Sequence, residues 1–470
     1  MKYYKFIKKS LFVAILVLTG SIFNACDEDI KLSKVDENNY ITSKETFGYI
    51  INGEGKQSKS MVEFRNNGST DLYLGLTKNA TQDINAKFKY DKSVLDAYNS
   101  LYESGYEALP EELVNFLNNG VVKLTSGESK SEAISVTFTN SESLKGDVSY
   151  VIPVSVEIES GNIQLSKDAS SFLIFVKDLS NLPDANKSTG IKIISCMEVN
   201  DTNPLNNLCF TLKTSGKPLI DMVILFSANI NYNNETGRVY VFNNPNVQHI
   251  LDNRDKYLKP LQDRGIKIVL GILGNHDISG VANLADNTAR EFAKELKATC
   301  DAYKLDGIFY DDEYSAYQYP APAGFVNPSS DAAARLCYET KQAMPDKLVC
   351  AYVYSRTAAF RNPVDGVEAG KFVDYGIHDY GGSYDLSSNY PGMPKSGMAL
   401  YSQEYSRGYT TSETNLKRLR DGGYGAHMIF AMDPLRYNFE YTQKPSMQRI
   451  AKVLFDDELV YDGKPYSKDW

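Results

Sequence analysis

Tryptophan, histidine and cysteine are scarce in this chain of 470 residues, which contains one Trp, four His and six Cys. The His residues have no metal-ligand spacing, which argues against a zinc hydrolase. No two Cys form a C-x-x-C motif, and all except Cys26 lie in apolar contexts, which predicts buried thiols rather than disulfides or a metal site. We therefore expect neither a metal nor a cofactor.

Long runs of Lys and Arg are also absent, and the formal net charge is −9. Because phosphate contacts need clustered basic side chains, we expect no nucleic-acid partner. Tyrosine is plentiful, with 33 residues, and its flat ring and hydroxyl suit sugar-like surfaces, although Tyr is equally common in strands. A hydrophobic share of 42% and a charged share of 23% are typical of globular proteins, and the length predicts two domains or at most three.

The first 25 residues have the pattern of a secretory signal. Four Lys precede an apolar run at 11–18 that is too short to span a membrane. Residues 21–26 resemble a bacterial lipobox, which implies that Cys26 is lipidated after removal of 1–25; ordinary secretion with an incidental Cys is the alternative. The acidic residues 27–29 resemble the surface-export signal of Bacteroidetes lipoproteins. The segment thus implies a lipid anchor and an outer-membrane, surface-exposed location.

The chain divides by pattern after this signal. Residues 26–45 are polar and are interpreted as a tether, and 179–190 have linker composition. The segment 46–178 contains short alternating runs typical of an antiparallel β-sandwich and no catalytic constellation. The runs are 71–76, 86–90, 133–138, 149–158 and 171–176.

Residues 191–470 change to eight apolar runs, most of them separated by stretches of helical periodicity. This alternation predicts a (β/α)8 TIM barrel. A doubly wound open sheet is the alternative, but no Gly-rich phosphate loop follows the first strand. The predicted strands are 191–199, 222–230, 266–273, 307–310, 348–354, 372–377, 398–402 and 426–432, with helices at 247–264, 288–303 and 332–344.

Polar residues cluster where the predicted strands end, which is where barrel enzymes carry their chemistry. Asn275 and His276 end the third strand and are candidates for binding a saccharide, or for stabilising a loop. The seventh and eighth strands add four candidates for lining the cleft. These are Tyr401, Gln403, Glu404 and Asp433, of which Asp433 would look the same as a helix cap.

The fourth predicted strand carries the most informative segment, 305–314. Side chains alternate along a strand, so Phe309, Asp311 and Glu313 share a face. With that face inward, two adjacent carboxyl groups meet at the barrel mouth, and their mutual repulsion raises one pKa. A protonated Glu beside an ionised Asp is what a glycosidase needs to protonate a leaving oxygen. An acidic loop that caps the next helix is the alternative.

This segment resembles the D-G-x-D-x-D-x-E signature of glycoside hydrolase family 18, and its D-D-E-Y ending resembles the endo-β-N-acetylglucosaminidase H and F1 branch. The similarity extends over most of 191–455, in blocks at 197–200, 225–232, 259–267 and 273–276. The segment 46–178 resembles the N-terminal sandwich of surface glycan-degrading lipoproteins.

The resemblance implies specific roles. Glu313 matches the general acid/base, and Asp311 matches the carboxylate that orients the 2-acetamido group of the substrate. Tyr380 is the candidate hydroxyl that supports this group, or alternatively a stacking residue. Phe309, also a candidate contact residue, stands where many members have an inner Asp. The loss of that inner Asp either shifts the pKa of Asp311, or an apolar residue is tolerated at this position in the H and F1 branch.

Three functions follow from these patterns. The first is a monomeric, cell-surface endo-β-N-acetylglucosaminidase that cleaves the core of high-mannose or hybrid N-linked glycans on glycoproteins. The second is a non-catalytic glycan-binding lipoprotein, which the retained Glu313 argues against. The third is a chitinase, which would normally use a Trp-lined groove that a chain with one Trp, Trp470, has difficulty building.

Overall fold

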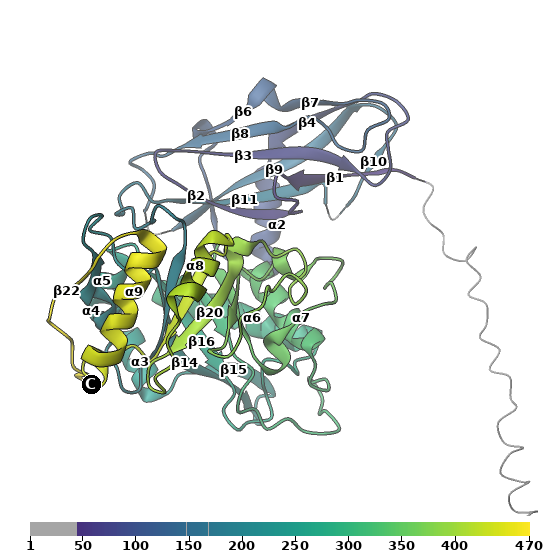
Figure 1. Cartoon of the computed structure of the whole chain (residues 1–470). Helices are drawn as coiled ribbons and strands as arrows, with labels where there is room; N and C mark the ends of the chain where they lie inside the picture. The colour runs from purple at the N-terminus through teal and green to yellow at the C-terminus, as the bar shows by residue number, and fades with distance from the viewer. Residues whose placement is uncertain (1–44, 147, 168) are drawn as a thin grey trace, which may run out of the picture. The chain divides into compact units, whose positions relative to one another are not determined.

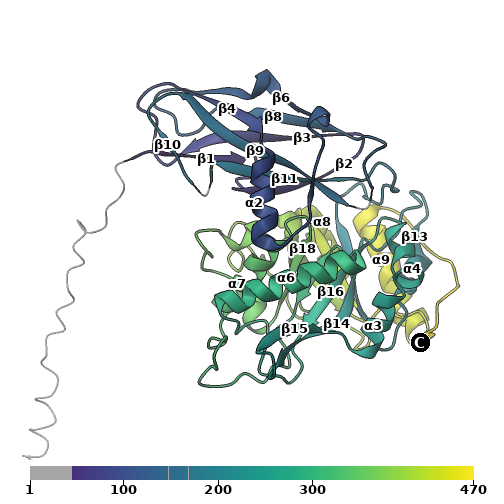
Figure 2. The same cartoon turned by 180° about the vertical axis from the view of Figure 1, so that it is seen from behind.

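The computed structural model describes residues 45–146, 148–167 and 169–470 (Figures 1 and 2). The predicted signal, the lipidation site at Cys26 and most of the predicted tether lie outside these residues. Residues 47–470 form one compact unit. Within the described part of the chain, no helix is both long and apolar enough to cross a membrane.

The N-terminal part of this unit is a sandwich of two mainly antiparallel sheets. One sheet has the order β10-β1-β3-β8-β6, and the other has the order β2-β11-β9-β4-β7 with β5 beside β9. Buried side chains such as Leu74 and Ile174 fill the space between them. The strands are β1 Phe47–Asn52, β2 Lys59–Phe64, β3 Asn67–Leu76, β4 Ile84–Tyr90, β5 Glu107–Ala108, β6 Val114–Phe116, β7 Val121–Leu124, β8 Ile134–Thr139, β9 Ser149–Ser160, β10 Gln164–Leu165 and β11 Ser171–Asp178.

The sandwich also contains a helix, α2 (Lys92–Tyr102), that the strand pattern did not predict. Asp91 caps its N-terminus by accepting a hydrogen bond from the N–H of Ser93. Leu95 and Tyr98, one helical turn apart, pack on the outer face of the sheet against Phe175. The helix therefore covers apolar surface that the inner core leaves exposed.

The C-terminal part is a closed barrel of eight parallel strands, which confirms the predicted fold class. The strand order is β12-β21-β20-β19-β18-β17-β16-β14, and pairing of β12 with β14 closes the ring. An antiparallel strand, β15 (Arg238–Phe242), extends β14 at one end. The barrel strands are β12 Lys192–Glu198, β14 Met222–Asn233, β16 Lys267–Leu273, β17 Gly307–Tyr310, β18 Leu348–Val353, β19 Tyr375–His378, β20 Met398–Glu404 and β21 Ala426–Phe430.

The helical layer around the barrel is less regular than a full set of eight. Strands β12, β18 and β19 are followed by short 3-10 turns in place of an α-helix. These turns are η4 Pro204–Cys209, η5 Ser355–Ala358, η6 Ala369–Lys371 and η7 Lys395–Gly397. The connections that carry η4 to η7 contain Pro and Gly residues, such as Pro204, Pro363 and Pro391, which disfavour helix interiors. The helices are α3 Pro245–Asp252, α4 Arg254–Tyr257, α5 Lys259–Gln262, α6 Asp286–Tyr303, α7 Ser330–Ala343, α8 Glu413–Asp421 and α9 Lys444–Phe455, so the single helix predicted at 247–264 is three short ones.

Two apolar layers hold the barrel together. An inner cluster, which includes Cys196, Val269 and Phe309, fills the ring, and a larger cluster lies between strands and helices. The five described Cys residues are free and buried, as predicted. Alternation of inward and outward side chains therefore fixes which residues reach the interior.

Polar contacts tie the sandwich to the amino ends of the barrel strands. The hydroxyls of Tyr106 and Ser149 donate to the two carboxylate oxygens of Asp346, at 2.5 and 2.8 Å. Lys177 lies 3.4 Å from Asp306, which also accepts from the N–H of Ile268 at 2.9 Å. Asp306 thus supports the entrance of its strand, outside the mouth.

Candidate active site

Two carboxyl groups, Asp311 and Glu313, stand at the carboxyl end of β17. Phe309 points into the barrel interior, and the same alternation brings Asp311 and then Glu313 to the mouth. Asp311 is buried, with 3% of its surface exposed, whereas Glu313 is partly exposed. The structure therefore places one carboxyl group beneath the other, and only the upper one has open access to solvent.

Burial and mutual repulsion shift the pKa values of this pair. Burial, with the nearby charges of Glu313 and Asp312, raises the pKa of Asp311 well above its usual range. Burial also raises the pKa of Glu313; Asp312 adds to the effect, and Arg407 opposes it. Asp311 Oδ1 has no hydrogen-bond partner among the described residues. The site therefore favours a proton on the pair and leaves one buried acceptor atom open.

The floor beneath the carboxyl groups is apolar. The ring of Phe309 lies 6.5 Å from that of Phe226 and 5.8 Å from that of Tyr352. Only 1% of Phe309 is exposed, because it lies two residues deeper along the inward face than Asp311. Phe309 is therefore a packing residue of the floor, which corrects the expectation that it contacts a sugar directly.

Tyr354 is a further residue at the site, and it was not predicted. The Tyr354 side chain interacts with the Glu313 carboxyl group and lowers its pKa, which partly offsets the effect of burial. Tyr354 follows β18, and its ring stacks on that of Tyr352 at 6.1 Å. Cys350 of that strand faces inward, so alternation along the strand could have indicated that Tyr352 and Tyr354 also face the barrel interior and its mouth.

The loop after β16 supports the loop that carries Glu313. The N–H groups of Gly274 and His276 donate to the carbonyl oxygens of Glu313 and Tyr314, at 3.0 and 2.6 Å. The Asn275 side chain donates to that of Asn231 at 3.1 Å. Asn275 is partly exposed and His276 is exposed, and both predicted residues lie beside the loop that carries Glu313.

Two of the predicted residues on β20 do not face the cleft. A register shift between Ala399 and Tyr401 reverses the alternation of the strand. Tyr401 consequently joins the outer core, and Gln403 accepts from the Thr411 N–H and the Ser446 hydroxyl, at 2.7 and 2.6 Å. Both side chains point toward the helical layer, which corrects the expectation that they line the cleft.

Glu404 and Asp433 are at the mouth, but their carboxylates make local contacts. Glu404 is 1% exposed and accepts from the N–H groups of Ser406 and Arg407, at 2.9 and 2.7 Å. Asp433 accepts from the N–H of Leu435 at 3.0 Å and lies 3.5 Å from Arg436. Both residues therefore hold the turns that frame the mouth.

Tyr380 lies on the loop after β19, in contact with the loop after β20. Its hydroxyl accepts a hydrogen bond from Arg407, and its ring stacks on Tyr409 with centroids 5.3 Å apart. Glu198, at the end of β12, is another carboxyl group at the mouth. Its pKa is raised by burial and by nearby Asp201 and Glu404, and lowered by Arg436. The mouth is thus acidic with an aromatic rim.

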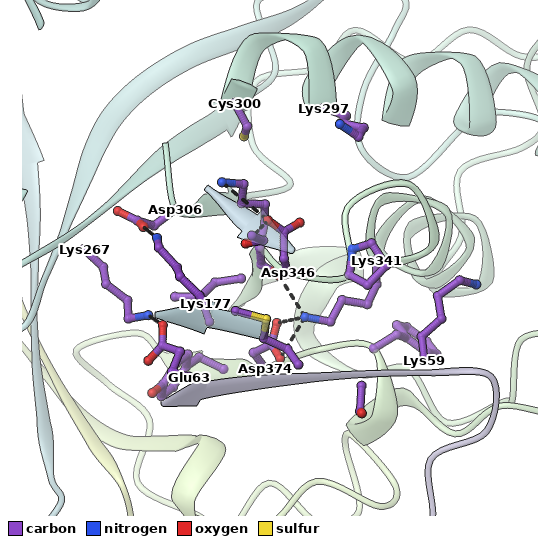
Figure 3. A pocket seen from close by; sticks show the side chains of 18 of the residues that line it. Lys59, Glu63, Lys177, Lys267, Lys297, Cys300, Asp306, Lys341, Asp346 and Asp374 are labelled. Carbon is purple, nitrogen blue, oxygen red and sulfur yellow. Dashed lines mark hydrogen bonds and ion pairs between the residues drawn. The ribbon is translucent and has the colours of Figure 1, made fainter. Parts of the chain in front are cut away.

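A large cleft lies away from this mouth, between the sandwich and the amino ends of the barrel strands. It has a volume of about 1620 Å³ and is lined by many Lys, Asp and Glu residues (Figure 3). Most of these charges are paired, as in Lys267 with Glu63 and Lys341 with Asp374. Its size therefore does not mark it as the active site.

Within the described residues, no group of three His, Cys, Asp or Glu side chains could hold a metal ion.

Comparisons with known proteins agree with this geometry. A family model with the description "-like, N-terminal domain" matches residues 39–163. Endo-β-N-acetylglucosaminidase F1 of Elizabethkingia meningoseptica is 66% identical over 280 residues, which are 60% of this chain and 83% of that protein. An endo-β-N-acetylglucosaminidase of a Flavobacterium species is 30% identical over 275 residues, which are 58% of this chain and 83% of its own length.

The fold also matches solved structures over nearly its whole length. EndoBT-3987 of Bacteroides thetaiotamicron, with Man5GlcNAc product, is 37% identical, with a TM-score of 0.80 over 89% of this chain and 99% of that one. The same protein in complex with Man9GlcNAc2Asn substrate is 35% identical, with a TM-score of 0.74 and the same coverage.

A parallel barrel with paired carboxyl groups at its mouth, whose pKa values burial raises, is the architecture of a glycoside hydrolase. The sequence identity to the two endo-β-N-acetylglucosaminidases identifies the family within the glycoside hydrolases. The chain belongs to the endo-β-N-acetylglucosaminidases of glycoside hydrolase family 18, as the sequence motifs indicated.

Proposed function

We propose that this enzyme hydrolyses the β-1,4 bond between the two core GlcNAc residues of N-linked glycans, with high-mannose glycans as its main substrates. The observation that carries this proposal is the position of Glu313, partly exposed above the buried Asp311 at the carboxyl end of β17. The complexes of EndoBT-3987 with Man5GlcNAc and Man9GlcNAc2Asn support the choice of glycan.

The first step of the proposed reaction uses Glu313 as the general acid. Its raised pKa keeps a proton available for the leaving oxygen of the inner GlcNAc. Asp311, whose Oδ1 atom lacks a partner among the described residues, would accept a hydrogen bond from the acetamido N–H. The acetamido oxygen then attacks the anomeric carbon, so the protein supplies no nucleophile.

The second step opens the cyclic oxazolinium intermediate that this attack forms. Glu313, now ionised, accepts a proton from water, and the water oxygen bonds to the anomeric carbon on the face that the leaving group occupied. Two inversions give net retention. Tyr380 is the candidate to support the acetamido oxygen, because its loop borders the mouth.

The test is a mass measurement on intact glycoproteins that carry high-mannose, hybrid or complex glycans. Each is incubated with the wild-type protein and with Glu313→Gln, which keeps the shape of the side chain but removes its acid. The expected result is a loss from the high-mannose glycoprotein that leaves one GlcNAc per site, with no loss for the variant. Unchanged masses on all three glycoproteins would contradict the proposal.

We further propose that the protein is a surface lipoprotein anchored through Cys26. The support is the basic and apolar pattern of residues 1–25 and the acidic residues that follow Cys26. Expression in a bacterial host fed a labelled fatty acid should label the wild-type protein but not Cys26→Ala. Equal labelling of the two, or a soluble wild-type protein with no label, would overturn this assignment.

A further inference from the structure

The turn at residues 404–409, which we call the rim turn, has its backbone fixed without help from its exposed side chains. The ends of the turn pair with each other, with N–H to carbonyl distances of 3.1 and 2.8 Å between Glu404 and Tyr409. The buried carboxylate of Glu404 accepts from two N–H groups inside the turn, those of Ser406 and Arg407. Replacing the side chain of Arg407 should therefore leave the turn intact.

The Arg407 side chain extends from this turn to Tyr380. Its Nε atom lies 3.7 Å from Glu404, and its guanidinium lies over the Tyr380 ring at 5.3 Å from the centroid. It also donates a hydrogen bond to the Tyr380 hydroxyl, whose ring stacks on Tyr409. Arg407 thus connects the loop that follows β19 to the loop that follows β20.

This contact determines which role the Tyr380 hydroxyl can play. A guanidinium has only donors, so the Tyr380 oxygen must act as the acceptor in this hydrogen bond. The phenolic hydrogen of Tyr380 is therefore left to point elsewhere. It can donate to an acceptor in the mouth, such as a carbonyl oxygen of the substrate.

Arg407 also interacts electrostatically with Glu313, which lies on the loop after β17, three strands away around the barrel. Its charge lowers the pKa of Glu313, against burial and against Asp312. The Tyr354 side chain also lowers this pKa, and Asp311 and Tyr314 are further titratable neighbours of Glu313. Arg407 is thus a positive charge beside a group of acids.

We propose that Arg407 is a positioning residue: it holds the Tyr380 hydroxyl so that its hydrogen is directed into the mouth, and from that position its positive charge also acts on Glu313. This inference rests on the proposed function. It predicts two separate effects, one on the rate through Tyr380 and one on the pH profile through Glu313.

The test compares Arg407→Met, Arg407→Lys and Tyr380→Phe by the pH dependence of kcat and KM on a Man9GlcNAc2Asn substrate. As the acid, Glu313 must hold its proton, so activity falls as the pH rises through its pKa. Loss of the cation raises that pKa, so Arg407→Met should move the basic limb upward by about half a pH unit and lower kcat about tenfold. Arg407→Lys keeps a positive charge, so its basic limb should stay in place, whereas its kcat should fall as in Arg407→Met.

Tyr380→Phe separates the two effects. It should lower kcat by about as much as Arg407→Met, leave the basic limb unchanged, and add little further loss in the double variant, because both changes remove one unit. Arg436→Met is the matched control, since Arg436 pairs with Asp433 and affects Glu198 rather than Glu313. Its basic limb should stay in place.

Two results would overturn the inference. One is an unchanged basic limb in Arg407→Met, and the other is a kcat loss that adds fully to that of Tyr380→Phe. Thermal midpoints close to wild type show that the variants are folded, as the fixed backbone of the rim turn predicts. A wild-type protein without activity would instead refute the proposed function, so the two failures are distinguishable.

Discussion

Asp311 combines a buried carboxyl group with an acceptor atom that has no partner among the described residues. Such a group costs stability in the absence of substrate, because burial opposes its ionised form. The same open atom is what allows it to accept a hydrogen bond from a ligand. We read this as a site where activity and stability are in conflict.

The first prediction concerns Asp311→Asn, which removes the ionisable group and keeps its size. We expect kcat to fall by roughly a hundredfold or more, because the acetamido group is no longer oriented. We also expect the variant to be more thermally stable than wild type at neutral pH. Steady-state kinetics and calorimetry measure the two effects.

The pH dependence of this stability difference has a definite sign. The pKa of Asp311 is raised in the folded state, so the folded protein binds its proton more tightly than the unfolded chain does. The contribution of Asp311 to stability is therefore lost as pH rises above the unfolded value of about 4. The advantage of Asp311→Asn should be small near that pH and grow above it. A constant difference between pH 4 and 8 would contradict this account.

The second prediction concerns Gly274, whose loop supports Glu313. An added Cβ atom would lie 2.3 Å from Ser315 Oγ and 2.4 Å from the carbonyl oxygen of Glu313. Gly274→Ala should therefore displace the catalytic loop and reduce kcat by about a hundredfold, since small misplacements of reacting groups are costly. Gly53→Ala is the control, because a Cβ there meets nothing within 4 Å. Equal kinetics for the two variants would refute the role of the loop.

The alternation of side chains along a strand explains which site residues could be predicted from the sequence. Alternation along β17 placed Asp311 and Glu313 correctly, because that strand is regular up to the mouth. The same reasoning failed for Tyr401 and Gln403, because the register shift in β20 cannot be detected in one sequence. Arg407 lies beyond the end of its strand, where no periodicity applies.

At the scale of elements, the loops after β17 and β18 are joined through Asp312. Its carboxylate accepts from the hydroxyl of Tyr317 and from the backbone N–H of Arg356, the latter at 3.1 Å. It also lies 3.4 Å from the Arg356 guanidinium. Asp312 thus connects the loop that carries Glu313 to the neighbouring loop and adds negative charge beside Glu313.

The third prediction is that Asp312→Asn moves the basic limb of the pH profile downward, opposite to the shift expected for Arg407→Met. Asp312 raises the pKa of Glu313, so its removal lets Glu313 lose its proton at lower pH, by about half a unit. Lost hydrogen bonds should also cost roughly 1–3 kcal/mol of stability. Asp263→Asn, which makes the same charge change in a pair with Lys259, should leave the limb unmoved. An upward shift in Asp312→Asn would contradict the assignment.

The elements themselves were predictable to different degrees. All eight barrel strands fall within or overlap the predicted runs, because buried parallel strands are continuous apolar segments. The helix predicted at 247–264 is interrupted at Asn253 and Leu258, and Pro260 follows the second break. Helix α2 was missed, since its apolar positions lie among strand-like runs.

At the scale of the whole molecule, the barrel uses its two ends differently. The carboxyl ends of its strands carry the acidic mouth, whereas the amino ends carry contacts to the sandwich. We therefore expect changes at the sandwich contacts to alter the stability of the protein without affecting Glu313.

The fourth prediction tests this division with Asp346→Ala. The substitution leaves the hydroxyls of Tyr106 and Ser149 and the charge of Lys347 without their partner, so we expect a loss of about 2 kcal/mol in the free energy of unfolding. The kinetic constants should remain those of wild type. Asp456→Asn, in an exposed pair with Lys452, should leave the stability close to that of wild type. A large fall in kcat for Asp346→Ala would show that the two ends are coupled.

The role of Glu313 is best tested by the masses of the products that the wild-type protein and Glu313→Gln form from Man9GlcNAc2Asn. We expect Man9GlcNAc and GlcNAc-Asn from the wild type, and intact substrate with the variant. Intact substrate with both proteins, or the same products from both, would contradict the assignment of Glu313 as the acid of an endo-β-N-acetylglucosaminidase.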